Sequence, residues 1–163
     1  MGKIAFVFAG QGAQYAGMGK SLYETSSAAR TVLDEAERLR PGTLNLCFAG
    51  SKEDLSKTLN TQPCLTAVDC ACAAALMERG VMPDGLAGFS LGEIAALVTG
   101  GLLTFVEAFA LVLRRAEWMQ ACAEKYESGM DETVGWLAGM GVDTEPVRVD
   151  PYTGRRMRIA ARI

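Results

Sequence analysis

The sequence contains no histidine in its 163 residues. Histidine is the side chain that most often removes the proton from a serine nucleophile near neutral pH. Its absence excludes a complete serine, histidine and aspartate triad within this chain. Covalent chemistry here would therefore need another base, or a base from outside the chain.

Cysteine is scarce and poorly arranged for cross-linking or metal binding. The five cysteines are odd in number, and no two of them form a C-x-x-C pair. We therefore predict no disulfide framework, no zinc site and no other metal site, in a reducing cytoplasm. The amino-terminal apolar run is shorter than a signal-peptide core, and no apolar stretch approaches a membrane span. The expectation is a soluble cytoplasmic protein without a membrane partner.

A broad positive charge is also missing. The net charge is −3 and the isoelectric point is about 5.1, which argues against nucleic acid as a partner. Residues 146–163 are the exception, because they carry five arginines against one acid, or +4, and leave −7 on residues 1–145. This break, with no clear periodicity from residue 145 onward, predicts an atypical basic tail and suggests a truncated or frame-shifted reading frame.

Apolar runs and amphipathic segments alternate along the first 140 residues. Residues 4–8 form a continuous apolar run that stops at a Gly-Gln-Gly turn, as expected of a buried parallel strand. Such alternation predicts an α/β fold with a largely parallel sheet and flanking helices. The other predicted elements are strands at 86–89 and 133–140, and helices at 31–40, from Ser51, from Pro63 (in the first turn) to Gly80, from the serine turn to Gly100, and from Thr104 to about Met119.

The run Gly88-Phe89-Ser90-Leu91-Gly92 matches the G-x-S-x-G pattern, in which a serine occupies a strained turn between a strand and a helix. The flanking glycines let neighbouring backbone pass close, and the hydroxyl of Ser90 is pushed outward. The amide of Leu91 and the positive helix end then face an oxyanion forming on an acylated serine. A plain glycine-rich turn is the alternative, but the strand before it and the helix after it favour a nucleophile.

No neighbour of Ser90 in the sequence is a good base. Glu93 lies one turn further along, but a carboxylate is a weak base for a serine proton. An acid at a helix N-terminus is explained more simply by the helix dipole. No lysine follows at the S-x-x-K spacing.

Two adjacent arginines, Arg114 and Arg115, must face different sides of their helix, because neighbouring residues are about 100° apart. Arg114 lies three residues before Glu117 and is predicted on a solvated, salt-bridged side. Arg115 has Leu111 and Trp118 as helical neighbours, at the edge of the apolar stripe. Two interpretations of Arg115 stay open: a snorkelling surface residue, or a fork that grips a carboxylate.

The loop after the first strand contains Gly10-Gln11-Gly12, and residues 19–21 look like the end of a Walker A loop. Neither nucleotide motif is complete, because the dinucleotide pattern needs glycine in place of Tyr15 and the Walker pattern needs glycine in place of Gln14. Ligands bind at the carboxyl edge of parallel strands. Gln11 is therefore predicted to offer an amide donor beside the serine turn.

Five motifs, taken together and in order, resemble the malonyl-CoA:acyl carrier protein transacylases, an acyltransferase family. The similarity runs from residue 3 to about 140. The motifs are FAGQGAQ at residues 8–14, GMG at 17–19, TQP at 61–63, GFSLGE at 88–93 and RAEWMQ at 115–120.

The resemblance implies a ping-pong transfer in fatty-acid biosynthesis. Ser90 would take malonyl from coenzyme A as an ester and deliver it to the phosphopantetheine thiol of acyl carrier protein. Gln11 and the Leu91 amide would form the oxyanion site, and Arg115 would bind the malonyl carboxylate, which favours the second interpretation of that residue. Malonyl-CoA and acyl carrier protein are then the partners, and no cofactor is needed.

The resemblance also implies how the chain divides. Residues 1–128 would be the amino-terminal part of an α/β-hydrolase-like large subdomain. Residues 129–145 would be only the start of a ferredoxin-like small subdomain, and residues 146–163 look like no part of the family.

Departures from the family pattern limit the expected activity. Phe89 stands where histidine is usual and Ala9 where proline is usual. The family's catalytic histidine lies in a second half that this chain lacks, so we expect trace acylation unless a complementing chain supplies it. One alternative is an inactive fragment that binds malonyl or acyl carrier protein. Another is an α/β-hydrolase-type serine esterase, which gives no reason for Arg115 or the Gln11 loop.

Overall fold

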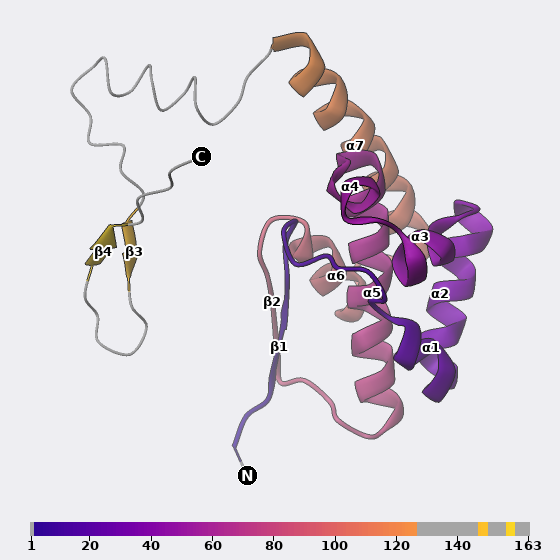
Figure 1. Cartoon of the computed structure of the whole chain (residues 1–163). Coiled ribbons are helices and arrows are strands. Elements are labelled where there is room, and N and C mark those ends of the chain that lie inside the picture. Colours follow the sequence, from indigo (N-terminus) through magenta and orange to yellow (C-terminus); the bar gives the residue numbers. More distant parts are fainter. Residues whose placement is uncertain (1, 127–146, 150–155, 159–163) are drawn as a thin grey trace. The chain divides into compact units, whose positions relative to one another are not determined.

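The computed structural model describes residues 2–126, 147–149 and 156–158 (Figure 1). The chain forms two compact units, Met1–Ala121 and Cys122–Ile163. Every residue predicted to belong to the site lies in the first unit. In the second, β3 (Val147–Val149) and β4 (Arg156–Arg158) pair as an antiparallel two-stranded sheet.

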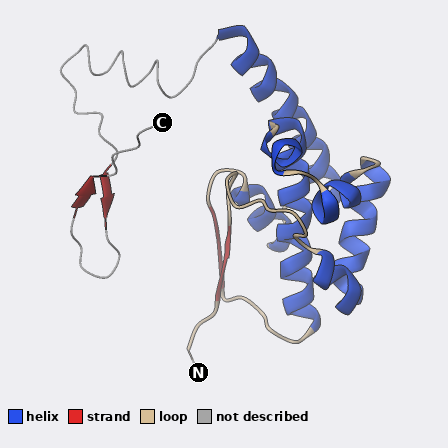
Figure 2. Cartoon of the chain, viewed as in Figure 1, coloured by secondary structure: helices blue, strands red, loops and turns tan. Residues whose placement is uncertain are grey.

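The first unit is an α/β structure built on two parallel strands. β1 (Ala5–Phe8) pairs with β2 (Gly85–Gly88), with Ala5 opposite Gly85 and Phe8 opposite Gly88. Parallel strands need a long crossover connection. Here five helices lie between the two strands in the sequence, and Figure 2 shows the strands beside these helices. The predicted α/β class with parallel strands is confirmed.

The helices of the described residues are α1 (Lys20–Thr25), α2 (Ser27–Leu39), α3 (Thr43–Ala49), α4 (Lys52–Ser56), α5 (Thr58–Glu78), α6 (Gly92–Thr99) and α7 (Phe105–Tyr126). None of them is long and apolar enough to cross a bilayer.

α5 is the central helix of the first unit. A helix that is apolar on every side is buried on every side, and residues 61–68 of α5 are all buried. The main core joins α5 to α2, α3, α4 and α7, and partly buried residues of α1 and α6 pack against it. A smaller core places Phe6 and Phe8 of β1 against α5 and α6. Val7, between these two phenylalanines, is 76% exposed, so the opposite face of β1 is open in the described part of the chain.

The start of α5 differs from the prediction. The helix begins at Thr58, so Pro63 lies inside it and not in its first turn. Proline removes one backbone donor from a helix. The turn of α5 before Pro63 is stabilised by the Thr61 hydroxyl, which donates to the carbonyl oxygens of Leu55 and Lys57.

Other helix starts follow their capping residues. Ser51 and Thr104 accept backbone hydrogen bonds at the starts of α4 and α7, as predicted. α2 begins at Ser27, earlier than the predicted residue 31, because the Ser26 hydroxyl accepts from the Ala29 amide at 3.1 Å.

Four elements were not predicted: α1, α3, β3 and β4. All are short, between three and seven residues. Pieces of this length show too few repeats for an apolar period to be visible. The predicted strand at 133–140 and the predicted subdomain start at 129–145 lie outside the described residues.

Candidate active site

The serine turn has the predicted form of a strand, a sharp turn and a helix. β2 ends at Gly88 and α6 begins at Gly92. Ser90 has a φ of 54°, and among the described residues no other non-glycine residue has a positive φ. The Phe89 amide donates to the Phe8 carbonyl at 3.1 Å, which ties the turn to the end of β1. Ser90 is exposed at this turn, so its side chain is accessible to a ligand.

Two glycines of the motif are required by space. A Cβ at Gly88 would overlap the backbone of Gly92 and Glu93, and a Cβ at Gly92 would overlap the Phe8 carbonyl oxygen. Neither glycine has a positive φ. These two positions therefore require glycine, because β1, the turn and α6 approach more closely there than a Cβ permits.

The structure brings Arg115 to Ser90. Arg115 Nη2 donates to Ser90 Oγ at 3.3 Å. Arg114 faces solvent, pairs with Glu117 at 2.9 Å and lies over the ring of Trp118. The predicted difference between the two arginines is confirmed, and Arg115 places a fixed cation beside the serine hydroxyl.

The structure brings Gln11 to a different neighbour. Gln11 Nε2 donates to Thr58 Oγ1 at 3.5 Å, and Gln11 Oε1 accepts from Gln62 Nε2 at 3.5 Å. No hydrogen bond joins Gln11 to Ser90 within residues 2–126. The Gln11 loop nevertheless contacts the serine turn, since a Cβ at Gly10 would lie 2.7 Å from the Phe89 carbonyl oxygen.

Gln62 also belongs to this region. In the sequence it stands out only as part of the TQP motif. Its side chain is fully buried, and its Nε2 also contacts Met119 Sδ at 3.2 Å. Met119 is one helical turn after Arg115, so Gln62 links the Gln11 loop to the helix that carries the arginine. Its Oε1 is buried without a hydrogen-bond partner in the described residues. The available signal was a glutamine followed by proline inside an otherwise apolar run.

No base approaches the serine in the described part of the chain. Glu93 is exposed in the first turn of α6 and makes no side-chain hydrogen bond to Ser90 there. A guanidinium has N–H donors and no acceptor, so Arg115 cannot accept the serine proton. The arrangement can hold an anion beside Ser90, but it does not activate the hydroxyl.

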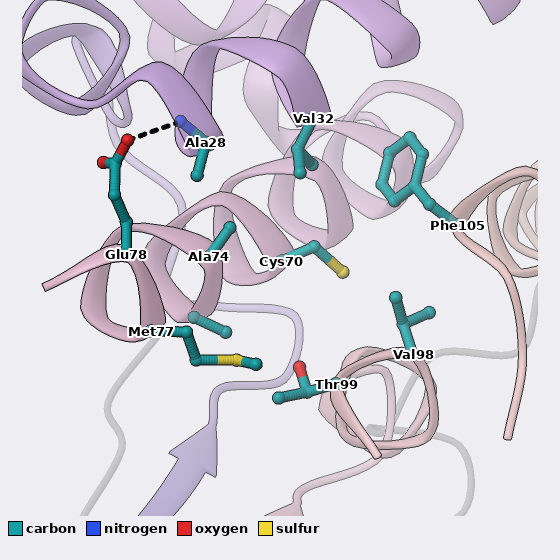
Figure 3. Close-up of a pocket in the computed structure, with 10 residues that line it drawn as sticks. Ala28, Val32, Cys70, Ala74, Met77, Glu78, Val98, Thr99 and Phe105 are labelled. Carbon is teal, nitrogen blue, oxygen red and sulfur yellow. Dashed lines mark hydrogen bonds between the residues drawn. The ribbon is translucent and has the colours of Figure 1, made fainter. Parts of the chain in front are cut away.

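Two cavities of about 390 Å³ lie near other parts of the first unit. One borders the Gln11 loop, between residues 12–16 and α4, and includes Lys52. The other lies among α2, α5, α6 and the start of α7, where Cys70, Val98 and Phe105 face it (Figure 3). Neither is lined by Ser90 or Arg115. Within the described residues, no group of three or more potential metal ligands is close enough to hold an ion.

Comparison with known proteins gives a consistent match. Residues 5–136 match the family model described as acyl transferase domain. The malonyl CoA-acyl carrier protein transacylase of Bacillus subtilis (strain 168) is 42% identical over 149 residues, covering 91% of this chain and 45% of that protein. The Staphylococcus aureus protein of the same name is 36% identical over 149 residues, covering 90% and 46%. The chain therefore spans less than half the length of these relatives.

Solved structures agree with this match. The Clostridium perfringens malonyl CoA-acyl carrier protein transacylase aligns with a TM-score of 0.71 at 29% identity, over 90% of this chain and 49% of that one. A malonyl-transacylase solved in complex with a type II polyketide synthase acyl-carrier protein aligns with a TM-score of 0.69 at 36% identity, over 74% and 40%.

Proposed function

Because the chain belongs to the acyl transferase domain family, we propose that it carries the serine half-site for malonyl transfer from coenzyme A to acyl carrier protein in fatty-acid biosynthesis. The observation that carries this proposal is the contact of 3.3 Å between Arg115 Nη2 and Ser90 Oγ at a strained turn. The names of the related proteins supply the acyl group and the acceptor. A cytoplasmic location is part of the proposal, since all five cysteines are unpaired.

The transfer takes place in two steps, acylation of Ser90 and transfer to the acceptor thiol. Ser90 Oγ attacks the thioester carbonyl of malonyl-CoA, the carbon–sulfur bond breaks, and coenzyme A leaves as its thiol with the serine proton. The thiol of acyl carrier protein then attacks the seryl ester, and Ser90 regains a proton as the new thioester forms. Malonyl-CoA is a substrate, and these steps use no resident cofactor.

The oxyanion of each step needs two donors. We assign the Leu91 amide as the fixed donor, because Leu91 directly precedes α6 and is 1% exposed. We assign Gln11 Nε2 as the second donor, which must turn away from Thr58 to reach the site. The contact between Gly10 and the backbone of Phe89 supports this assignment by keeping the loop beside the turn.

Arg115 is proposed to bind the free carboxylate of the malonyl group. A guanidinium offers paired donors that match a carboxylate, and it keeps its charge during the reaction. The hydrogen bond between Arg115 Nη2 and the Ser90 hydroxyl would break as substrate enters. Acyl groups without a carboxylate would leave this cation unpaired and are expected to react more slowly.

The chain has no histidine to remove the serine proton. A serine enzyme that loses one triad member keeps only about 10³–10⁴-fold acceleration over water from its oxyanion site and binding contacts. We therefore expect this chain by itself to acylate at trace level. A histidine supplied by a complementing chain would restore turnover.

The test is intact-protein mass spectrometry after incubation with malonyl-CoA. Wild type is compared with Ser90→Ala and Arg115→Ala, and Arg114→Ala is the matched control because its arginine faces solvent on the same helix. A slow malonyl adduct is expected that Ser90→Ala abolishes, Arg115→Ala reduces at least about tenfold and Arg114→Ala leaves unchanged. An adduct that persists in Ser90→Ala would contradict the assignment of the nucleophile.

Binding without chemistry is the second candidate, and the absence of any histidine favours it. In that case the chain holds malonyl or acyl carrier protein through the same residues. Calorimetry with malonyl-CoA separates the two, because saturable binding weakened by Arg115→Ala, with no adduct after long incubation, supports the binding fragment.

A further inference from the structure

Cys47 of α3 and Cys64 of α5 form a buried pair of thiols. Both side chains are 0% exposed. Cys47 Sγ donates to the Cys64 carbonyl at 3.9 Å, and Cys64 Sγ donates to the Thr43 carbonyl at 3.9 Å. The two contacts run in opposite directions between the same two helices, so each thiol is held against the backbone of the other helix.

The two thiols are not equivalent. The interaction between the two thiol side chains, together with burial, raises the pKa of Cys47, and the same interaction lowers the pKa of Cys64. The thiolate is the form of cysteine that attacks sulfur. Cys64 is therefore the thiol that attacks an external disulfide first, and Cys47 is the thiol that attacks in the second step.

The other cysteines are differently placed. Cys70 lines the apolar cavity of Figure 3, and Cys72 and Cys122 are exposed. Burial raises the pKa of Cys70 to about 12, so this thiol stays protonated. Within the described residues, Cys47 and Cys64 are the two cysteines whose thiols donate to the backbone of each other's helix.

This pair joins two supports of the Gln11 loop. The Cys47 carbonyl accepts the Gly17 amide at 2.9 Å, which holds the far end of that loop. Cys64 lies two residues after Gln62, whose amide contacts Gln11. A covalent bond between the sulfurs would fix both supports relative to each other.

We propose that Cys47 and Cys64 are a reversible oxidation site, which small-molecule disulfides convert to an internal disulfide. The Cys64 thiolate attacks one sulfur of the external disulfide, whose S–S bond breaks and releases one thiol. The Cys47 thiolate then attacks Cys64 Sγ and displaces the second thiol. Two protein thiols are oxidised, one external disulfide is reduced to two thiols, and the protons pass to the released thiolates.

Access to the buried pair requires only a local opening. α3 has seven residues, follows Gly42 at a φ of 90° and ends at Gly50. Proteins open segment by segment as well as globally. Release of α3 exposes both thiols while α5 stays folded.

The test uses the variant Cys70→Ala/Cys72→Ser/Cys122→Ser, which keeps only the proposed pair, and bis(2-hydroxyethyl) disulfide as the oxidant. In native buffer its mass should fall by two hydrogen atoms, and dithiothreitol should reverse the change. The bond closes a short loop, so the thermal midpoint should rise by about 5–10 °C. Adding Cys64→Ser is the matched control, which should gain a mixed disulfide or remain reduced.

A tryptic map of the oxidised variant should join residues 39–52, which contain Cys47, to residues 58–79, in which Cys64 is then the one remaining cysteine. Native protein that stays reduced, while the same variant in urea forms the bond, would overturn the proposal, because the site would then exist only in the unfolded chain. A stable mixed disulfide in place of the internal bond, or an oxidised form with a lower midpoint, would also overturn it.

Discussion

The backbone at Ser90 lies in a region that L-residues avoid, because Cβ approaches the following carbonyl oxygen at positive φ. Ser90→Gly and Ser90→Ala both remove the hydroxyl, but only glycine also removes Cβ. We expect Ser90→Gly to be more stable than Ser90→Ala by about 0.5–1 kcal/mol, after allowing for the larger chain entropy of unfolded glycine. Urea unfolding followed by circular dichroism measures the difference. Equal stabilities would show that this φ is not strained.

Gly92 limits the serine turn in a different way, through space and not through φ. Gly92→Ala places Cβ on the Phe8 carbonyl oxygen, which cannot move without disturbing β1. We expect a loss of about 3 kcal/mol in the free energy of unfolding. Gly85→Ala is the control, because nothing lies within 4 Å of a Cβ there, and its change should stay within about 0.5 kcal/mol. Similar losses in both variants would refute the steric argument.

At the scale of elements, Glu78 at the end of α5 holds the start of α2. Its carboxylate accepts from the hydroxyls of Ser26 and Ser27 and from the Ala28 amide. These hydrogen bonds, those from the two hydroxyls first, lower the pKa of Glu78 from 4.5 to about 2. A depressed pKa means that the folded state favours the charged form, so this contribution is present above about pH 4.5.

The stabilisation contributed by the charged Glu78 should disappear as the pH falls from about 4.5 to 2. Glu78→Gln should therefore be less stable than wild type at pH 7, and the difference should shrink below pH 4. Urea midpoints across this range measure it, with exposed Glu24→Gln as the control. A difference between Glu78→Gln and wild type that stays constant down to pH 2 would contradict the assignment.

The elements that could be predicted from the sequence are those with a visible period or a cap. β1, α4 and α7 followed from an apolar run and from Ser51 and Thr104. The start of α5 could not be predicted, because Pro63 normally marks a first turn. The turn before it is held by hydrogen bonds from the Thr61 hydroxyl to Leu55 and Lys57, which no apolar period reveals. α1 and α3 are held by contacts with α2 and α5, which the local sequence does not contain.

The same distinction applies to the site. Ser90 and Leu91 follow from a five-residue pattern, and the different surroundings of Arg114 and Arg115 follow from helical spacing. The contact between Arg115 and Ser90 joins residues 25 positions apart. The hydrogen bond of Gln62 to Gln11 joins residues 51 positions apart. Neither contact can be read from a local pattern, because each depends on how α7 and α5 pack beside the strands.

At the scale of the whole molecule, β1 and β2 form a two-stranded sheet in the described part of the chain, so each strand has an unpaired edge there. Val7 is 76% exposed on a two-stranded sheet, and such strands pair readily with other chains. We expect Val7→Lys to reduce self-association at high protein concentration, as measured by sedimentation velocity. Leu102→Lys is the control, because Leu102 is 75% exposed in the turn after α6 and not on a strand. Equal effects would show that general surface hydrophobicity, not the strand, drives association.

The φ of Ser90 also has an evolutionary consequence. Substitution of Ser90 by glycine would relax the positive φ of the turn. In a lineage that makes no use of the hydroxyl, selection for a foldable product would therefore remove this serine early. The strained serine turn is thus a position where loss of function would leave a trace sooner than elsewhere in the chain.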